Sequence, residues 1–304
     1  MLRESIFIVL VASLTMPVVR AESPSVSTPA NQLVDKLELD PFYAKHVSAN
    51  GFPILGSVKV SDAALHEAAY LIDQMLKGRE DIRAALIDSK TRFDVMAPDE
   101  FTTDIPEHSD LTPKIFWDRR ARGLGATPVR PTVSCGEENL LCLRGDPYHA
   151  ENILVHEFAH AIHDMGLTRI DENFDARLRA IYDQAINDGL WKGKYAANNH
   201  HEYWAEGVQS YFGTNRPPDH DHNHVDTREE LTEYDPRLFA MIDETFRGNP
   251  WRYTRPEHRK DLPHLGGWDV ARLPTFAWPE HLVQEGDKQK RDREQPASGE
   301  ANPD

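Results

Sequence analysis

The chain has 304 residues with 50 acidic and 34 basic side chains, which give a formal net charge of −16. An acidic chain repels nucleic acid, and no basic stripe with interleaved aromatic residues is present, so we expect no DNA or RNA partner. A membrane span needs roughly 18 apolar residues, and no segment after residue 19 approaches this length. We therefore expect no membrane span.

The N-terminus has the pattern of an export signal. A short charged start precedes an apolar run over residues 6–19, and small residues stand at the −3 and −1 positions of a cleavage site after Ala21. We predict a signal peptide over residues 1–21 and a secreted or periplasmic protein, with an uncleaved anchor as the alternative. Residues 22–30, rich in Ser and Pro, predict a linker.

Both helix and strand signals follow the linker. Ser61 can cap a helix over residues 62–77, whose apolar residues recur at helical spacing. Residues 91–96 alternate like a strand, and residues 114–117 are a candidate for another. Residues 126–133 contain two prolines, which favour an edge strand or an extended loop. We expect residues 126–134 to align a substrate backbone if a catalytic site lies nearby.

Cys135 and Cys142 are the only cysteines, and they lie seven residues apart. In an oxidising compartment such a pair predicts a disulfide that closes a small loop. Free thiols or a shared metal ion are the alternatives.

Residues 156–160 read His-Glu-Phe-Ala-His, which is the HExxH pattern of a zinc site. On a helix, His156 and His160 share a face, so both imidazoles can reach one metal ion. Glu157 stands beside them and can polarise a water at the metal. A catalytic zinc ion takes three protein ligands and one water, so a third ligand must come from elsewhere.

A helix over residues 148–165 is predicted to carry this motif. Its apolar residues form one face, and the other face carries His149, His156, His160 and His163. Such a helix suits a buried active site, and a solvated surface helix is the alternative.

The spacing of later residues limits the third ligand. The extended metzincin pattern requires Gly at position 163 and His at position 166, whereas the chain has His163 and Gly166, so that class is excluded. Glu172 lies only twelve residues beyond His160, where the chain is still turning.

A later helix supplies better candidates for the third ligand. A helix is predicted over residues 173–188 and another from Asn199 to about Phe212. Glu202 and Glu206 lie four residues apart in the second of these helices, so they share one face. One carboxylate can bind the metal ion while the other orients a ligand.

Seven residues in two patterns resemble a known family. They are His156-Glu157-x-x-His160 and, in the order Tyr-x-x-x-Asn-x-x-Glu-x-x-x-Glu, Tyr195, Asn199, Glu202 and Glu206. This set resembles the catalytic domain of anthrax lethal factor and its relatives, which are zinc endopeptidases of the gluzincin type. The resemblance covers residues 148–212, and the toxin's other domains have no counterpart here.

The resemblance implies a role for each residue. One Zn²⁺ ion per chain would be bound by His156, His160 and Glu202. Glu157 would be the general base, and Tyr195 would donate a hydrogen bond to the tetrahedral oxyanion. Glu206 would stand behind the metal ion and orient its ligands.

A cluster of acidic residues follows the predicted helix that carries Glu202 and Glu206. Positions 1, 3, 5 and 12 of an EF-hand loop are matched by Asp219, Asp221, Asn223 and Glu230. His224 occupies the position where that loop requires glycine, and Thr227 can form a capping box with Glu230. A second metal site and a polar loop bordering the cleft are the alternatives.

The patterns together predict an α+β fold, a zincin-like metallopeptidase domain over residues 31–285. Residues 31–147 form its N-terminal part, residues 148–285 its helix-rich catalytic part, and residues 286–304 a disordered tail. The predicted activity is metalloendopeptidase action on a peptide or protein substrate. A zinc hydrolase of another amide, such as a cell-wall peptide, and a catalytically silent binding protein are the alternatives.

Overall fold

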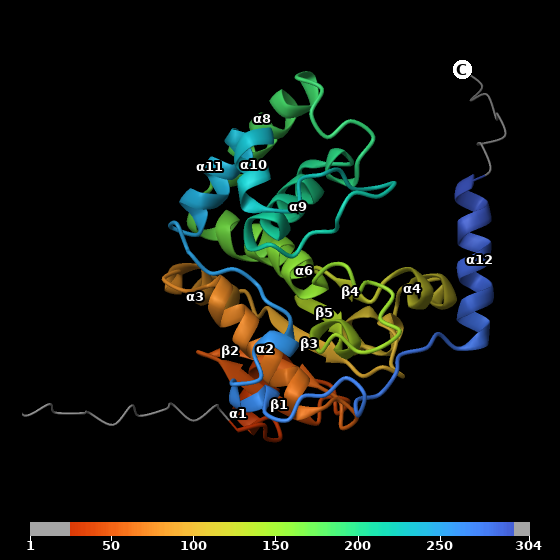
Figure 1. Ribbon diagram of the computed structural model, residues 1–304. Coiled ribbons are helices and arrows are strands. Elements are labelled where there is room, and N and C mark those ends of the chain that lie inside the picture. The colour runs from red at the N-terminus through yellow and green to blue at the C-terminus, as the bar shows by residue number, and fades with distance from the viewer. Residues whose placement is uncertain (1–24, 295–304) are drawn as a thin grey trace, which may run out of the picture.

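The computed structural model describes residues 25–294, which combine helices with one small sheet (Figure 1). The predicted signal peptide lies outside these residues. No helix in the described range is long and apolar enough to cross a membrane. Because the described residues combine helices with a sheet, the predicted α+β class is confirmed for this part of the chain.

Five strands within residues 25–294 form one mixed sheet. In chain order they are β1 (Lys45–Ala49), β2 (Phe52–Gly56), β3 (Arg92–Met96), β4 (Gly123–Leu124) and β5 (Thr132–Gly136). Their spatial order is β1-β2-β3-β5-β4. The three central strands β2, β3 and β5 run parallel, while β1 and β4 run antiparallel to their neighbours at the two edges.

Alternating side chains of β2 face two different cores. Ile54 belongs to the main core, whereas Leu55 packs with residues of helix α1 (Asn31–Leu37) and of the segment that follows it. This alternation follows from the two-residue period of a strand. Helices α2 (Asp62–Met75) and α6 (Ile153–Ala161) pack on the sheet and contact each other, so they cover the face of the main core.

Helix α6 lies between the sheet and a group of later helices (Figure 1). This group contains α8 (Phe174–Asn187), α9 (His200–Phe212), α10 (Arg228–Tyr234) and α11 (Pro236–Thr245), and α9 packs directly on α6. The remaining helices are α3 (Glu80–Asp88), α4 (Lys114–Arg120), α5 (Glu137–Leu140), α7 (Thr168–Ile170) and α12 (Glu280–Glu294). Short 3₁₀ turns cover Thr102–Asp104, Pro106–His108, Tyr195–Ala197, Pro256–His258 and Pro263–Leu265.

Several predicted elements are confirmed. Helix α2 begins after Ser61, whose hydroxyl accepts a hydrogen bond from the backbone N–H of Ala64 at 3.2 Å. Strand β3, helix α8 and helix α9 occupy the ranges that the sequence patterns predict.

The helix that carries the HExxH motif is shorter at its start than predicted. Asn152 caps α6, because its side chain accepts a hydrogen bond from the N–H of Val155, so the helix begins at Ile153. After Ala161 it continues as a π-helical turn, η3 (Ile162–Leu167). His149 therefore lies before the helix and does not share its histidine face.

Residues 126–131 lie outside the strands, as the extended-loop alternative predicted, whereas the edge-strand alternative is wrong. Within residues 126–133, the residues from Thr132 onward belong to β5, which lies inside the sheet between β3 and β4. The edge strand on this side is β4, at Gly123–Leu124. A strand of two residues is too short to produce an alternating pattern that sequence analysis can recognise.

Two predictions about irregular or extended segments are wrong. Residues 114–117 form the first part of helix α4, because a short apolar run does not distinguish a strand from a helix. Residues 286–294 of the predicted tail belong to α12, which packs on α4. Its composition resembles that of a disordered tail because most of its side chains face solvent, whereas Leu282 is buried.

The predicted disulfide is also wrong, because Cys135 and Cys142 are both free thiols. Cys135 lies on β5 with its side chain in the main core. Cys142 follows α5 in a left-handed conformation, and its sulfur lies 3.7 Å from the hydroxyl of Tyr253. The short helix between them turns the two side chains toward different neighbours.

A buried ion pair anchors β4. The guanidinium of Arg122, the residue before this strand, donates hydrogen bonds to the carboxylate of Glu138 at 2.5 and 3.0 Å, and both side chains are fully buried. Breaking such a pair leaves one buried charge without its partner. We expect Glu138→Ala to lower the free energy of unfolding by about 3–5 kcal/mol in a urea titration.

The exposed Glu233 provides a control for this experiment, since Glu233→Ala should change stability by less than about 0.5 kcal/mol. A similarly small effect of Glu138→Ala would contradict the assignment of the pair as an anchor of β4.

Candidate metal centre

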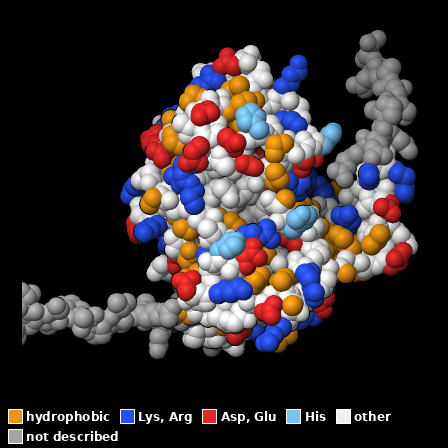
Figure 2. All heavy atoms as spheres, viewed as in Figure 1, with side chains coloured by type: hydrophobic (Ala, Val, Ile, Leu, Met, Phe, Trp, Pro, Cys, Tyr) orange, Lys and Arg blue, Asp and Glu red, His pale blue; other side chains and the backbone are white. Residues whose placement is uncertain are grey.

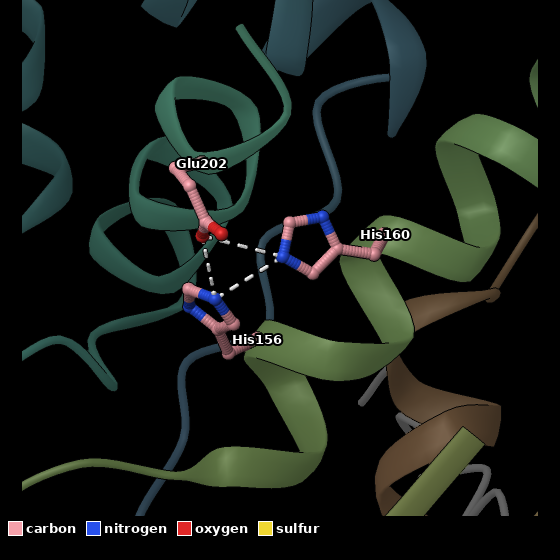
Figure 3. A group of neighbouring side chains, drawn as sticks. All are labelled: His156, His160 and Glu202. Carbon is pink, nitrogen blue, oxygen red and sulfur yellow. Dashed lines mark hydrogen bonds and ion pairs between the residues drawn. The ribbon is translucent and has the colours of Figure 1, made fainter. Parts of the chain in front are cut away.

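Helices α6 and α9 bring two imidazoles and one carboxylate together (Figure 3). His156 and His160 lie one turn apart on α6, and Glu202 lies in the first turn of α9. The Nε2 atoms of the two histidines are 3.2 Å apart. A carboxylate oxygen of Glu202 lies 3.1 Å from Nε2 of His156 and 3.4 Å from Nε2 of His160.

These distances match the donor arrangement of a zinc site. Zinc binds imidazole nitrogen and carboxylate oxygen at about 2.0–2.2 Å, so the ligand atoms of a tetrahedral site lie about 3.3 Å apart. The three separations observed here fall close to that value without any rearrangement of side chains. The three residues therefore fit a zinc ion.

The start of α9 and a hydrogen bond from α9 to α6 fix the position of Glu202 relative to the two histidines. Asn199 caps α9, because its side-chain oxygen accepts hydrogen bonds from the backbone N–H groups of His201 and Glu202 at 2.9 and 3.0 Å. This cap sets the direction of the first turn, from which Glu202 reaches α6. The indole N–H of Trp204 also donates to the carbonyl of Ala159 at 2.9 Å, which ties α9 directly to α6.

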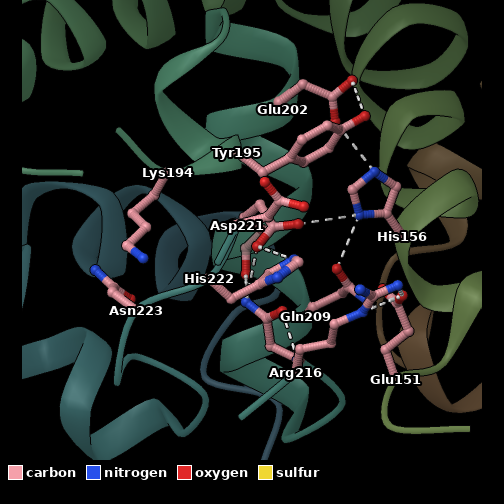
Figure 4. A network of polar contacts seen from close by, with 12 residues as sticks. Glu151, His156, Lys194, Tyr195, Glu202, Gln209, Arg216, Asp221, His222 and Asn223 are labelled. Atoms are coloured by element: carbon pink, nitrogen blue, oxygen red, sulfur yellow. Dashed lines mark hydrogen bonds and ion pairs between the residues drawn. The ribbon is translucent and has the colours of Figure 1, made fainter. Parts of the chain in front are cut away.

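Gln209 orients the imidazole of His156. Its side-chain oxygen lies 2.8 Å from Nδ1 of His156, while its amide nitrogen donates to Glu151 at 3.2 Å. Arg216 in turn donates to the carboxylate of Glu151 (Figure 4). Because the carboxylate requires a donor, the amide oxygen must face His156, which places the proton on Nδ1 and leaves Nε2 free for a metal ion.

Three residues of this network, Gln209, Glu151 and Arg216, belong to no motif that the sequence shows. Gln209 lies seven residues after Glu202, on the same face of α9, and this spacing is the signal that could have indicated it.

We expect Gln209→Met to weaken zinc binding by about 10–100-fold, because the imidazole of His156 would lose the acceptor that orients it. Competition with a chromophoric chelator measures this affinity. Gln284→Met, at an exposed position on α12, is the control and should leave the affinity unchanged. An affinity within about twofold of the wild type in Gln209→Met would rule out this orienting role.

The charges at the site favour ionised Glu202 and a more basic Glu157. Burial opposes the ionisation of Glu202, but hydrogen bonds with His156 and His160 outweigh it and hold the pKa of this carboxyl far below its usual range. Burial raises the pKa of Glu157, and the two imidazoles only partly offset this effect. A carboxylate with a raised pKa is a stronger proton acceptor near neutral pH.

Tyr195 and Glu206 both lie close to the three ligands. The hydroxyl of Tyr195 donates to the carboxylate of Glu202 at 3.3 Å, and burial raises the pKa of this phenol. Glu206 is buried with one oxygen 3.6 Å from Nδ1 of His156, while its other oxygen accepts a hydrogen bond from Asn215 at 3.1 Å. Glu206 thus lies behind His156, but the shorter contact with that ring comes from Gln209.

The three ligands line a cleft of about 870 Å³. One wall is the chain from Gly123 to Thr127, which includes the edge strand β4, and Glu157 also lines the cleft. Side chains of α4 and α12 form a further part of the wall. Acidic and basic side chains are interspersed over the face seen in Figure 2, without one large patch of either sign.

Two glycines allow the edge strand to approach α6. A Cβ atom at Gly125 would lie 2.9 Å from Cβ of His160, and one at Gly123 would lie 2.4 Å from a methyl carbon of Ile153. Any larger residue would push the strand away from the helix that carries both histidines. No sequence motif indicates this close approach.

The loop over residues 219–226 borders the cleft, as one of the two alternatives predicted, because Asp221 and His222 line it. One oxygen of Asp219 accepts hydrogen bonds from the backbone N–H groups of Asp221 and His222, both at 2.8 Å. The predicted capping box between Thr227 and Glu230 is present. Among the described residues, the groups suited to a metal ion do not include this loop.

Comparison with known proteins does not assign the chain to a family. No family model matches the chain, and no curated protein matches it. Among solved structures, the PRO-PRO endopeptidase PPEP-2 from Paenibacillus alvei matches at 16% identity, over 63% of this chain and 95% of the other, with a TM-score of 0.34. Because this score is low, we infer the function from the geometry of the site, and the relationship to lethal factor stays a prediction.

Proposed function

We propose that this protein is a zinc-dependent endopeptidase that hydrolyses a peptide bond in an extended peptide or protein segment. The observation that supports this most strongly is the set of three ligand atoms, 3.1–3.4 Å apart, beside a half-buried Glu157 in an open cleft. A site that only held a structural metal ion would have no need of an additional carboxylate in the cleft.

Each residue has a role in this proposal. His156, His160 and Glu202 hold the zinc ion, which when bound lowers the pKa of a water to about 7 and polarises a carbonyl. Glu157 accepts a proton from the attacking water and passes it to the leaving amine. The hydroxyl of Tyr195 turns from Glu202 toward the substrate oxygen, where negative charge develops in the transition state.

The edge strand β4 gives the substrate its direction. Its inner side pairs with β5, and no strand among residues 25–294 pairs with its outer side. An extended peptide can therefore add to this edge through backbone hydrogen bonds. Because Gly123 and Gly125 hold the strand against α6, a peptide bound there would pass directly over His160 and Glu157.

We further propose export of the protein, on the basis of the sequence pattern over residues 1–21.

Cleavage of a peptide library, analysed by mass spectrometry, tests the proposed activity. The metal-free protein should be inactive, and zinc should restore cleavage at defined sites. His160→Ala should abolish zinc-restored cleavage, whereas His281→Ala, at an exposed position on α12, should retain it. If the zinc-loaded wild type cleaves cell-wall peptides but no linear peptide, the activity is that of another amide hydrolase. If it cleaves neither, the endopeptidase proposal fails.

A further inference from the structure

A second cluster of imidazoles and carboxylates lies beside the candidate zinc centre. His163 and Asp164 come from the π-helical turn η3, and His201 comes from the first turn of α9. One oxygen of Asp164 lies 3.4 Å from Nδ1 of His163 and 3.3 Å from Nδ1 of His201. Asp164 and His201 also line the cleft, so this cluster is open to the same solvent as the first site.

His163 is the unusual member of this cluster. Its side chain is fully buried, and neither ring nitrogen has a well-directed hydrogen-bond partner. Nε2 does lie 3.2 Å from an oxygen of Asp175, but without hydrogen-bond geometry. Leaving a buried polar group without a hydrogen bond costs about 1–3 kcal/mol, so native proteins rarely tolerate it. A metal ion bound to Nδ1 would satisfy this ring.

The backbone is also irregular at this point. Helix α6 changes to π-helical hydrogen bonding exactly over the turn that contains His163 and Asp164. Single π turns within helices are rare and often occur at functional sites, where they redirect side chains.

We propose that His163, Asp164 and His201 bind a second divalent metal ion, and that Asp175 supports the ring of His163 from behind. Two imidazole nitrogens and one carboxylate oxygen are a donor set that suits zinc. The three ligand atoms lie within 4.8 Å of one another, and two of the separations are close to those of a tetrahedral site. The carboxylate behind the imidazole matches the usual support of a metal-bound histidine.

An overlapping group made of Asp175, His200 and His201 is the weaker alternative. One oxygen of Asp175 already accepts a hydrogen bond from Arg179 at 2.7 Å, and the other lies 2.9 Å from Nε2 of His200. Its members therefore already have partners, whereas His163 has none with hydrogen-bond geometry.

Zinc stoichiometry in a background without the first site tests this proposal. We would combine His156→Ala with His160→Ala in the full-length protein, remove all metal, add zinc, and measure bound zinc by mass spectrometry after dialysis. We expect one equivalent in this background and none after adding Asp164→Asn, which keeps the shape of the side chain. His163→Gln and His201→Gln should remove the same equivalent, and His281→Ala should not.

The outcome does not depend on the proposed catalysis, since no activity is measured. If the double variant binds no zinc, or if its zinc survives Asp164→Asn and His201→Gln, the second site does not exist. Circular dichroism of each variant separates loss of the ion from loss of the fold.

Discussion

Replacing Glu157 with glutamine is expected to lower kcat by about 10²–10⁴-fold, which is the usual contribution of a general acid–base group. Glutamine has nearly the same shape but cannot accept a proton from water or return it to the leaving amine. The effect should be confined to the chemical step, because Glu157 is not among the three residues that fit the zinc ion. Steady-state kinetics on a cleaved peptide, together with zinc analysis, measures both quantities.

The control for this variant is Glu233→Gln, at an exposed position of α10, which should leave kcat and bound zinc unchanged. A Glu157→Gln protein that retains its zinc and keeps kcat within about threefold of the wild type would show that another group accepts the proton.

The second large effect is expected for Tyr195→Phe, which should lower kcat by about 10²–10³-fold with little change in KM. The ring of Tyr195 lies 6.2 Å from that of His156, and phenylalanine preserves this contact. Only the hydroxyl is lost, and in the proposed mechanism this hydroxyl donates to the oxyanion that forms in the transition state. The effect should therefore appear in kcat and not in substrate binding.

Tyr211→Phe removes a hydroxyl from α9 that bonds to Asp243 and does not line the cleft, so it should retain full kcat. If Tyr195→Phe raised KM while leaving kcat intact, the tyrosine would bind substrate and would not stabilise the transition state.

The local part of the site was predictable because it depends on helix periodicity. The spacing of His156 and His160 places them on one face, and Glu202 follows a recognisable cap at Asn199. The structure places the ligand atoms of these three side chains within 4.8 Å of one another, and their role as metal ligands stays a prediction. For Tyr195 a role at this site was implied by the resemblance alone, and the structure places its hydroxyl 3.3 Å from the carboxylate of Glu202.

The missing parts of the site depend on contacts between distant segments. Gln209 matters because Glu151, 58 residues earlier, fixes its amide. The approach of β4 depends on glycines whose neighbours come from α6. Local propensity contains no information about such partners, and the buried Arg122 and Glu138 that hold the strand were invisible for the same reason.

The buried tertiary partners also explain the errors. Cys135 and Cys142 have a spacing that permits a disulfide, but α5 between them sends one sulfur to the core and the other to Tyr253. Composition alone likewise could not show that residues 286–294 form part of a helix that packs on α4.

The three candidate metal ligands come from two helices that are otherwise joined mainly by side-chain packing. His156 and His160 belong to α6, which packs on the sheet. Glu202 belongs to α9, which is one of the group of later helices. An ion bound by all three is therefore a crosslink between the two halves of the molecule. Its binding free energy becomes part of the free energy of folding, and an ion at 100 times its dissociation constant adds about 2.7 kcal/mol. Metal supply would then regulate the lifetime of the folded protein as well as its chemistry.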